Sequence, residues 1–244
     1  MFRIHRNLAL ATAMAAIMLA AQPAEAGVVI TGTRVIFPAQ EREVTLRLTN
    51  TAQKPVLVQS WIDDGDARST PAQATAVPFV LRPPVFRMNA DSGQALRILH
   101  TGQPMPEDRE SVYYLNVLEV PAAGAEADQA HLQLIIRSRL KVFYRPKGLS
   151  AAGAAKAASQ LVWTASRAGS GWVLEARNPT AYHVSINSII TANERIAAGL
   201  AAPFATTRYT LSQAQLNAIG SAVTFETVSD HGAKIPVTVP LTQP

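Results

Sequence analysis

Basic side chains with no acidic neighbour gather at the end of one apolar stretch, and they are the clearest candidates for chemistry in this sequence. The stretch is HLQLIIRSRLKVFYRP, residues 131–146. Its apolar half contains Leu132, Leu134 and Ile136, and its basic half contains Arg137, Arg139, Lys141 and Arg145. Guanidinium and ammonium groups bind carboxylates through charge-assisted hydrogen bonds, so the segment predicts a site for an anion.

Two explanations account for such a strand. Lysine and arginine on an exposed edge strand discourage pairing with other chains, which explains Arg137 and Arg139. The apolar half would still leave a hydrophobic edge unless the strand is meant to pair with a partner. We therefore favour a strand that is lent to another chain. In that arrangement main-chain hydrogen bonds give affinity, and a cation at the end fixes the register by binding the partner's terminal carboxylate.

Residues that would support other chemistry are scattered. No histidine has the spacing of a metal-binding motif, and the five are His5, His100, His131, His183 and His231. The sequence contains no cysteine and no nucleophile-elbow, P-loop or dinucleotide-binding glycine motif. We predict no metal, no cofactor, no small-molecule substrate and no enzymatic activity. A hydrolase assembled from distant residues stays open as a third interpretation.

The charge balance is only mildly basic. The chain has 22 Lys and Arg against 17 Asp and Glu, a formal net charge of +5. Such a balance does not predict nucleic-acid binding, and no basic cluster is interleaved with aromatic residues.

The first 26 residues have the features of a signal peptide. A basic start is followed by a short apolar core and by the small-x-small ending Ala24-Glu25-Ala26. We therefore expect cleavage after residues 1–26 and export. A chain without cysteine must then be held together by packing alone, even in an oxidising compartment.

The elements that must position these residues are short strands. EVTLRLTN alternates Val44, Leu46 and Leu48 with polar residues, which is the pattern of a half-buried strand. Similar runs, separated by turn-prone segments, are KPVLVQSWIDD, ALRIL, SVYYLNVLEV and HLQLIIRSRLKVFY. No amphipathic helix is long enough to cross over, so the pattern predicts an antiparallel sandwich that closes near Pro146.

A compositional break follows this predicted sandwich. RPKGLSAAGAAKAASQ, residues 145–160, has no β-branched residue, and we interpret it as an interdomain elbow with an exposed arm. The next stretch predicts a hairpin that turns at Gly169-Ser170-Gly171, and further strand patterns reach the C-terminus. The predicted fold class is all-β, with a first domain at residues 27–147 and a second at residues 148–244.

Five motifs in a fixed order carry a resemblance to a known family. They are TRVIFP, VQSWIDD, PEDRESVYYLNVLEVP, LKVFYRP and NPTAYHVSI. From about Gly27 onward the sequence resembles the periplasmic pilus-assembly chaperones of the chaperone–usher pathway. The resemblance implies two immunoglobulin-like β-sandwich domains in an L-shaped arrangement with a cleft between them. It implies a periplasmic location, with pilin subunits and an outer-membrane usher as partners; self-association of the free protein is a further expectation.

The resemblance also implies roles for single residues. Arg34 in GTRVIFP and Lys141 in SRLKVFYRP match the cation pair that binds the C-terminal carboxylate of a pilin. The donor-strand residues that complete the subunit's sandwich would be Leu132, Leu134 and Ile136. Lys141 and Leu134 have opposite parity in a regular strand, so either a β-bulge intervenes or the cation and the apolar row face different ways.

An ion network between the domains is the last feature that the resemblance implies. Its residues would be Arg97, Glu110, Arg145 and Asp230. Carboxylates and guanidiniums from both domains would fix the angle of the cleft, while adding little net stability.

The predicted function is therefore a non-enzymatic periplasmic chaperone. It would bind and stabilise pilin subunits, donate a β-strand to them and deliver them to an outer-membrane usher. The alternative is a secreted immunoglobulin-like binding module or adhesin, which would need neither Arg34 nor Lys141.

Overall fold

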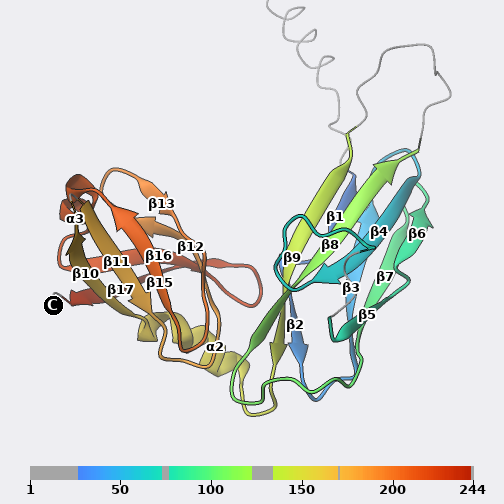
Figure 1. The fold of residues 1–244 in the computed structure, drawn as a ribbon. Helices are drawn as coiled ribbons and strands as arrows, with labels where there is room; N and C mark the ends of the chain where they lie inside the picture. The colour runs from blue at the N-terminus through green and yellow to red at the C-terminus, as the bar shows by residue number, and fades with distance from the viewer. Residues whose placement is uncertain (1–26, 73–76, 123–133, 170, 243–244) are drawn as a thin grey trace, which may run out of the picture.

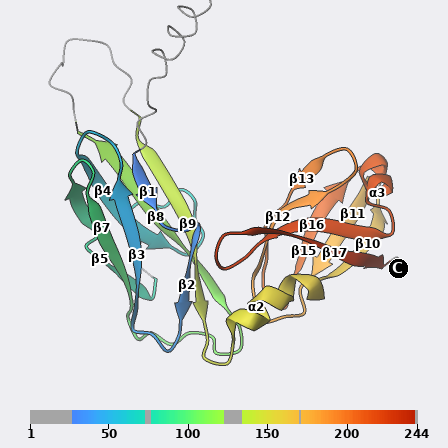
Figure 2. The same ribbon diagram turned by 180° about the vertical axis from the view of Figure 1, so that it is seen from behind.

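The computed structural model describes residues 27–72, 77–122, 134–169 and 171–242. These residues fold into two β-sandwich lobes that stand at an angle to each other, with a short helix where they meet (Figures 1 and 2). The prediction of two β-sandwich domains is confirmed. Within the described residues the fold is mostly rather than entirely β, because the chain beyond the first lobe also forms three short helical segments.

The first lobe consists of two packed sheets. One has the order β1-β3-β7-β5 and is formed by β1 (Val28–Ile30), β3 (Glu43–Asn50), β7 (Gly93–His100) and β5 (Phe79–Arg82). The other has the order β2-β9-β8-β4-β6 and is formed by β2 (Arg34–Pro38), β9 (Ile136–Arg145), β8 (Ser111–Pro121), β4 (Val56–Asp63) and β6 (Val85–Met88). Neighbouring strands are antiparallel, except that β2 and β9 run in the same direction.

Alternating apolar residues of both sheets build the core of this lobe. Leu48 of β3, Ile98 of β7, Leu115 of β8 and Val142 of β9 are all fully buried. Burying side chains of this size stabilises the fold by about 1.5–3 kcal/mol each. Because successive side chains of a strand point to opposite faces, the same alternation places Lys141 of β9 on the outer face of its sheet.

The chain changes sheets between β1 and β2, and this crossing shapes one edge of β9. Gly32, with a φ of +94°, lies in the connecting bend, and β2 then begins with Arg34 opposite Lys141 of β9. β9 is flanked by β8 along almost its whole length, but by β2 only along its second half. Within the described chain, the backbone of residues 136–140 therefore has no strand partner on the side of β2.

The second lobe contains one continuous path of strands in the order β13-β12-β16-β17-β10-β11-β15, with β14 beside β12. Its strands are β10 (Val162–Ala168), β11 (Gly171–Arg177), β12 (Val184–Ile190), β13 (Arg195–Ala197), β14 (Leu200–Ala201), β15 (Thr206–Leu211), β16 (Ala222–Val228) and β17 (Lys234–Thr242). β17 joins the two halves of the path because it pairs antiparallel with β16 and, near its end, parallel with β10. Trp163 and Phe225 pack in the buried core, with their ring centroids 5.3 Å apart.

The hairpin of β10 and β11 forms where the sequence predicts it. The two strands pair as far as Ala168 opposite Gly171, and Gly169 in the turn has a φ of +58°. Glycine adopts such a positive angle without steric cost, which explains its place in this turn.

The helical segments correct the prediction for the region beyond Pro146. The segment expected as an exposed arm contains α2 (Ala151–Ala157) and the 3-10 turn η1 (Ala158–Gln160), and six of residues 151–160 are exposed. The Ser150 side chain caps α2 by accepting a hydrogen bond from the Gly153 N–H, and alanine has the highest helix propensity. The prediction also lacks α3 (Gln213–Ile219), although its capping box is visible in the sequence. Among the described residues, no helix is long and apolar enough to cross a membrane.

Candidate functional site

Arg34 and Lys141, the two predicted anion-binding cations, lie side by side. Arg34 is the first residue of β2, and the parallel register of β2 and β9 places it directly opposite Lys141. Adjacent strands are about 4.8 Å apart, so both side chains start from neighbouring points of the same sheet. The structure therefore brings together two cations that are far apart in the sequence.

The ammonium of Lys141 lacks a compensating partner. Among the described residues it forms no hydrogen bond and no ion pair. Burial lowers the pKa of Lys141 below its ordinary value, and the nearby charges of Arg34 and Arg139 lower it further. A half-buried cation between two other cations is an electrostatic environment that favours the binding of an anion.

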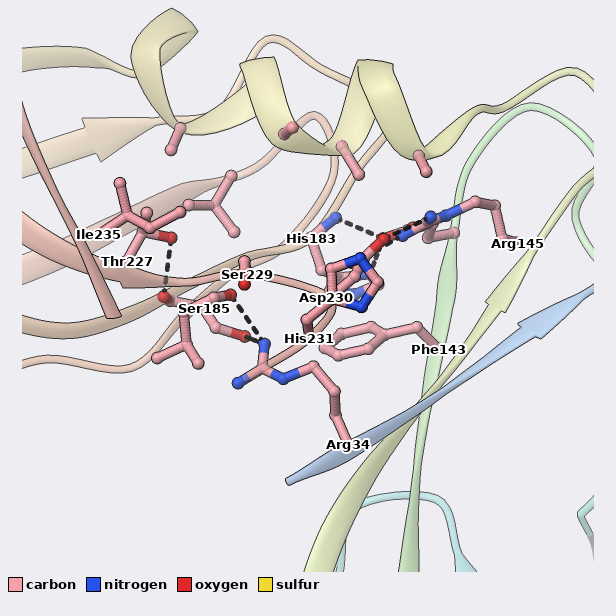
Figure 3. A pocket seen from close by; sticks show the side chains of 17 residues that line it. Arg34, Phe143, Arg145, His183, Ser185, Thr227, Ser229, Asp230, His231 and Ile235 are labelled. Atoms are coloured by element: carbon pink, nitrogen blue, oxygen red, sulfur yellow. Dashed lines mark hydrogen bonds and ion pairs between the residues drawn. The ribbon is translucent and has the colours of Figure 1, made fainter. Parts of the chain in front are cut away.

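Arg34 contacts the second lobe through one nitrogen of its guanidinium. Its Nη1 donates to the carbonyl oxygen of Val228 at 2.9 Å and to Ser185 Oγ at 3.3 Å, both in the second lobe (Figure 3). Its Nε is buried without a hydrogen-bond partner among the described residues. Burial lowers the pKa of Arg34, and the charge of Asp230 partly offsets this effect. Arg34 thus contacts the second lobe through Nη1, while its charge remains beside that of Lys141.

Three of the four residues predicted for the ion network meet at the junction of the lobes. Arg145 Nε donates to Glu110 Oε1 at 2.7 Å, and Arg145 Nη1 donates to Asp230 Oδ2 at 2.7 Å. Arg145 and Glu110 are buried, with exposed fractions of 6% and 4%. Burial lowers the pKa of Arg145, but hydrogen bonds to Asp230 and Glu110 outweigh it and the pKa is raised overall. The guanidinium therefore stays charged and links carboxylates of both lobes.

The fourth predicted member, Arg97, is not in this network. It belongs to β7, in the sheet that does not contain β9, and it faces outward between the buried Leu96 and Ile98. Its guanidinium forms an exposed ion pair with Glu43 of β3. The assignment of Arg97 to the interdomain network is wrong, because its sheet turns it toward solvent and away from the second lobe.

Backbone groups that sequence motifs could not reveal complete the junction. Glu110 Oε2 accepts from the His183 N–H at 2.8 Å, and the Glu110 N–H donates to the carbonyl of Ala181 at 2.9 Å. The buried Asn178 holds this loop in shape by donating to the carbonyl of Tyr182 at 2.7 Å. Asn178 in the motif NPTAYHVSI therefore shapes the loop by local hydrogen bonds. The hydrogen bond of this loop with Glu110 joins distant segments, so the motif alone could not reveal it.

The turn between β16 and β17 reaches from the second lobe toward the first (Figures 1 and 2). It carries Asp230, and its Gly232 has a φ of +84°. A Cβ atom at Gly232 would lie 2.7 Å from Thr33 Oγ1, just before β2. Glycine is therefore required here both by the backbone angle and by the close approach of the two lobes.

A small cavity lies behind these contacts. Its volume is about 120 Å³, and it is lined by Arg34, Glu110, Arg145, His183 and Asp230 together with alanines of α2 (Figure 3). Small-molecule sites usually measure about 300–1,000 Å³, so this cavity does not have the size of a substrate pocket.

The predicted donor row is only partly within the described chain. Leu132 lies outside the described residues. Leu134 precedes β9 and is 62% exposed, while Ile136, the first residue of β9, is 48% exposed. Pairing of β9 with β8 is continuous from Ile136 to Tyr144, so no bulge separates Ile136 from Lys141. The cation and Ile136 therefore project from opposite faces of the strand.

Two family models match the chain. Residues 27–150 match the model described as "Pili and flagellar-assembly chaperone, PapD N-terminal domain". Residues 156–239 match the model described as "Pili assembly chaperone PapD, C-terminal domain".

Two curated relatives illustrate the similarity in sequence. The chaperone protein FimB/FhaD of Bordetella pertussis is 42% identical over 243 residues, with 97% of each chain covered. The probable fimbrial chaperone YadV of Escherichia coli is 38% identical over 218 residues, with 86% of this chain and 88% of the relative covered.

Solved structures agree with this similarity. The CupB2 chaperone of Pseudomonas aeruginosa has a TM-score of 0.71 at 37% identity, covering 88% of this chain and 100% of that one. The complex of the Salmonella enterica SafA pilin with the SafB chaperone contains a chain with a TM-score of 0.72 at 27% identity. That match covers 91% of this chain and 99% of the other.

Proposed function

This chain belongs to the PapD-like family of pilus-assembly chaperones, and from that membership we propose how it holds its subunits. It is a non-enzymatic periplasmic chaperone that binds pilin subunits for chaperone–usher assembly. In our proposal, β9 lends its unpaired edge to a subunit that lacks a strand. Arg34 and Lys141 bind the carboxylate at the end of that subunit's chain.

The single observation that carries the proposal is where the free edge of β9 stops. Residues 136–140 have no partner on one side within the described chain, and β2 occupies that side from Lys141 onward. An added strand whose chain ends at this point would run parallel to β9, in line with β2. Its last residue would then meet Arg34 and Lys141, the two cations at the boundary.

The apolar end of β9 supports the same arrangement. Leu134, Ile135 and Ile136 are 62%, 60% and 48% exposed, which is a large apolar surface for one short segment. Insertion of the donor-strand residues into an incomplete sandwich would remove them from water. Leu132 is assigned to this row from the sequence alone. The same exposed edge supports self-association of the free chaperone.

The ion network fits a role in setting the cleft. Arg145 holds carboxylates of both lobes, Glu110 and Asp230, in buried or partly buried positions. Such pairs add little net stability, so their contribution lies in geometry. We infer that they fix the distance between the edge of β9 and the second lobe.

The division of the chain follows the same reasoning. We propose a signal peptide at residues 1–26, a chaperone domain at residues 27–147 and a second domain at residues 148–244. Two separate hydrophobic cores, one on each side of the segment between β9 and α2, support the boundary.

Charge reversal of Lys141 tests the anchoring role. Each cation contributes about 1.5–3 kcal/mol to carboxylate binding, so Lys141→Glu should lower the subunit affinity at least 10-fold. The measurement is the amount of soluble pilin recovered with the chaperone after co-expression in the periplasm. Lys54→Glu is the matched control, because it makes the same change at an exposed site on the β3–β4 loop.

Synthetic peptides separate the anchor from other contributions. A peptide with the last strand of the subunit should bind wild-type protein about 10-fold more tightly as the free acid than as the amide. Lys141→Glu should lose this preference. If the charge-reversed protein recovers as much subunit as the Lys54→Glu protein does, the carboxylate anchor is wrong.

A further inference from the structure

The basic residues on the outer face of β9 do not have equal surroundings. This face presents Arg137, Arg139, Lys141 and Arg145, with Phe143 at the outward position between the last two. Arg145 is bound by two carboxylates, and Arg139 is bound by the carboxylate of Asp63 in β4. Lys141 lies between these two paired arginines and, within the described chain, has no partner of its own.

Asp63 is a buried carboxylate that accepts hydrogen bonds from three segments, namely β9, β8 and the loop after β4. Its side chain is 3% exposed and accepts from Arg139, from Asn116 Nδ2 at 2.6 Å, from Ser69 Oγ at 2.9 Å and from the Gly65 N–H at 2.8 Å. Burial raises the pKa of Asp63, but these hydrogen bonds outweigh it and hold the pKa below its ordinary value. Asp63 is therefore ionised at neutral pH and acts as a fixed negative charge.

Strand register determines which cation this charge can reach. Asp63 of β4 lies opposite Tyr114 of β8, and Tyr114 lies opposite Lys141 of β9. Two strand spacings, about 9.5 Å, and the Tyr114 side chain separate Asp63 from Lys141. Arg139 is longer and crosses the Tyr114 ring, with its Cζ 3.8 Å from the ring centroid, to reach Asp63. Asp63 thus neutralises Arg139 and leaves Lys141 uncompensated.

The same carboxylate also holds the next arginine, directly through an ion pair of 4.0 Å between Arg137 Nη2 and Asp63 Oδ2, and indirectly through Asn116. Asn116 donates to Asp63, and its oxygen accepts from Arg137 Nη2 at 2.6 Å and from Arg137 Nε at 3.0 Å. The Arg137 guanidinium also lies over the Trp61 ring, 4.7 Å from its centroid. Both arginines are consequently directed toward β4, away from the edge where Arg34 stands.

We propose that Asp63 is a positioning residue for subunit recognition: by binding Arg139 it removes a competing cation, so that the subunit's terminal carboxylate is bound only at Lys141 and Arg34. This inference rests on the carboxylate anchor proposed above. Arg139 precedes Lys141 by two residues, the smallest shift that keeps the same side chains facing the core. A free Arg139 would bind the carboxylate about 7 Å away along β9. The side chains of the subunit's strand would then still face the correct sides of the sheet, but each would lie two residues from its proper partner.

A set of four variants tests the role of Asp63 against the free-acid peptide of a subunit's last strand. Asp63→Asn should not weaken peptide binding, because a register at Arg139 adds to the one already available, but it should move the bound carboxylate to Arg139. Asp63→Asn with Arg139→Gln should return the carboxylate to Lys141, with an affinity within about 3-fold of wild type. Arg139→Gln alone should bind like wild type, whereas Lys141→Gln should lose at least 10-fold.

The position of the carboxylate gives a readout that a purely structural role would not move. In crystals of the peptide complexes, it should lie at Lys141 in wild-type protein and in the double variant, and at Arg139 in Asp63→Asn. NMR of the lysine side chains should also show a higher pKa for Lys141 in Arg139→Gln, because a like charge is removed.

The outcomes separate this inference from the anchor itself. Wild-type binding with the carboxylate away from Lys141 would overturn the anchor and this inference together. A carboxylate that stays at Lys141 in Asp63→Asn, or a shift of register that Arg139→Gln does not repair, overturns the role of Asp63 alone. If Asp63→Asn does not fold, Arg139→Gln decides: a loss as large as that of Lys141→Gln would make Arg139 a direct ligand and overturn the inference.

Discussion

Two cationic sites only four residues apart on β9 have opposite surroundings. Arg145 is buried and bound by Glu110 and Asp230, and its charge joins the two lobes. Lys141 is half-buried, lies beside Arg34 and has no anion among the described residues. The comparison teaches that the compensated charge of Arg145 joins the two lobes, whereas the uncompensated charge of Lys141 is available for the carboxylate that we propose as its ligand. Substitutions at the two sites should therefore have different effects.

The largest effect should follow from breaking the compensated site. Arg145→Met leaves the buried Glu110 without its guanidinium, and removal of one partner from a buried pair costs about 3–5 kcal/mol. The free energy of unfolding in urea measures this loss. Arg97→Met is the control, because its ion pair with Glu43 is exposed and should contribute little. Equal destabilisation by both variants would contradict the distinction.

The uncompensated site should show the reverse balance. Lys141→Met should change the free energy of unfolding by less than about 0.5 kcal/mol, since no partner is lost. It should weaken subunit binding by about 1.5–3 kcal/mol, or roughly 10- to 150-fold. Calorimetric titration with the subunit peptide and urea unfolding of the same sample give both numbers. A variant that loses stability and keeps affinity would reverse the assignment.

A smaller effect should come from the close contact between Gly232 of the second lobe and Thr33 of the first. Gly232→Ala places a Cβ against Thr33 and forces a non-glycine residue to a φ of +84°, at a cost of about 1–2 kcal/mol. Gly220→Ala is the matched control, because its φ is +72° and nothing lies within 4 Å of the added atom. Both should lower the melting temperature, but only Gly232→Ala should change the small-angle scattering profile. Identical profiles would show that Gly232 does not set the angle between the lobes.

The smallest effect is a pH dependence that belongs to Lys141. Its folded-state pKa is lowered, so the unfolded chain holds the proton more tightly as pH rises toward about 10.4. The charged lysine therefore costs stability at neutral pH, and this cost disappears between the folded and unfolded pKa values. Relative to Lys141→Met, wild-type protein should gain stability as the pH rises through that window. A constant difference in unfolding free energy between pH 7 and pH 10 would contradict it.

The sequence predicts the strands well because their patterns are local. The alternation in EVTLRLTN and the glycine at position 169 each specify a structure within a few residues. The helix at residues 151–160 has a local cause too, since the absence of β-branched residues disfavours a strand and the Ser150 side chain caps the helix. The sequence therefore specifies the type of each of these elements, provided that helix caps are considered together with strand patterns.

The residues of the candidate site can be predicted from the sequence only where they belong to a recognisable motif. Arg34 and Lys141 are far apart in sequence, and the parallel register that joins them depends on the chain changing sheets at Gly32. The outward direction of Arg97 follows from alternation, but the sheet to which it belongs does not. The role of Asp63 is not visible in the sequence for a similar reason, because its hydrogen bond with Arg139 joins β4 to β9 across β8, between residues 76 positions apart.

The point at which β2 begins to pair with β9 has a consequence for the kind of segment that this protein can bind. Since its own chain fills the line of the edge beyond Lys141, an incoming segment has nowhere to continue in the plane of the sheet. A polypeptide that merely passes through would have to bend away before its backbone was fully paired, whereas one that finishes there needs no further space. In the binding mode that we propose, the fold discriminates between the tail of a molecule and its middle by obstruction, whatever the sequence of the tail.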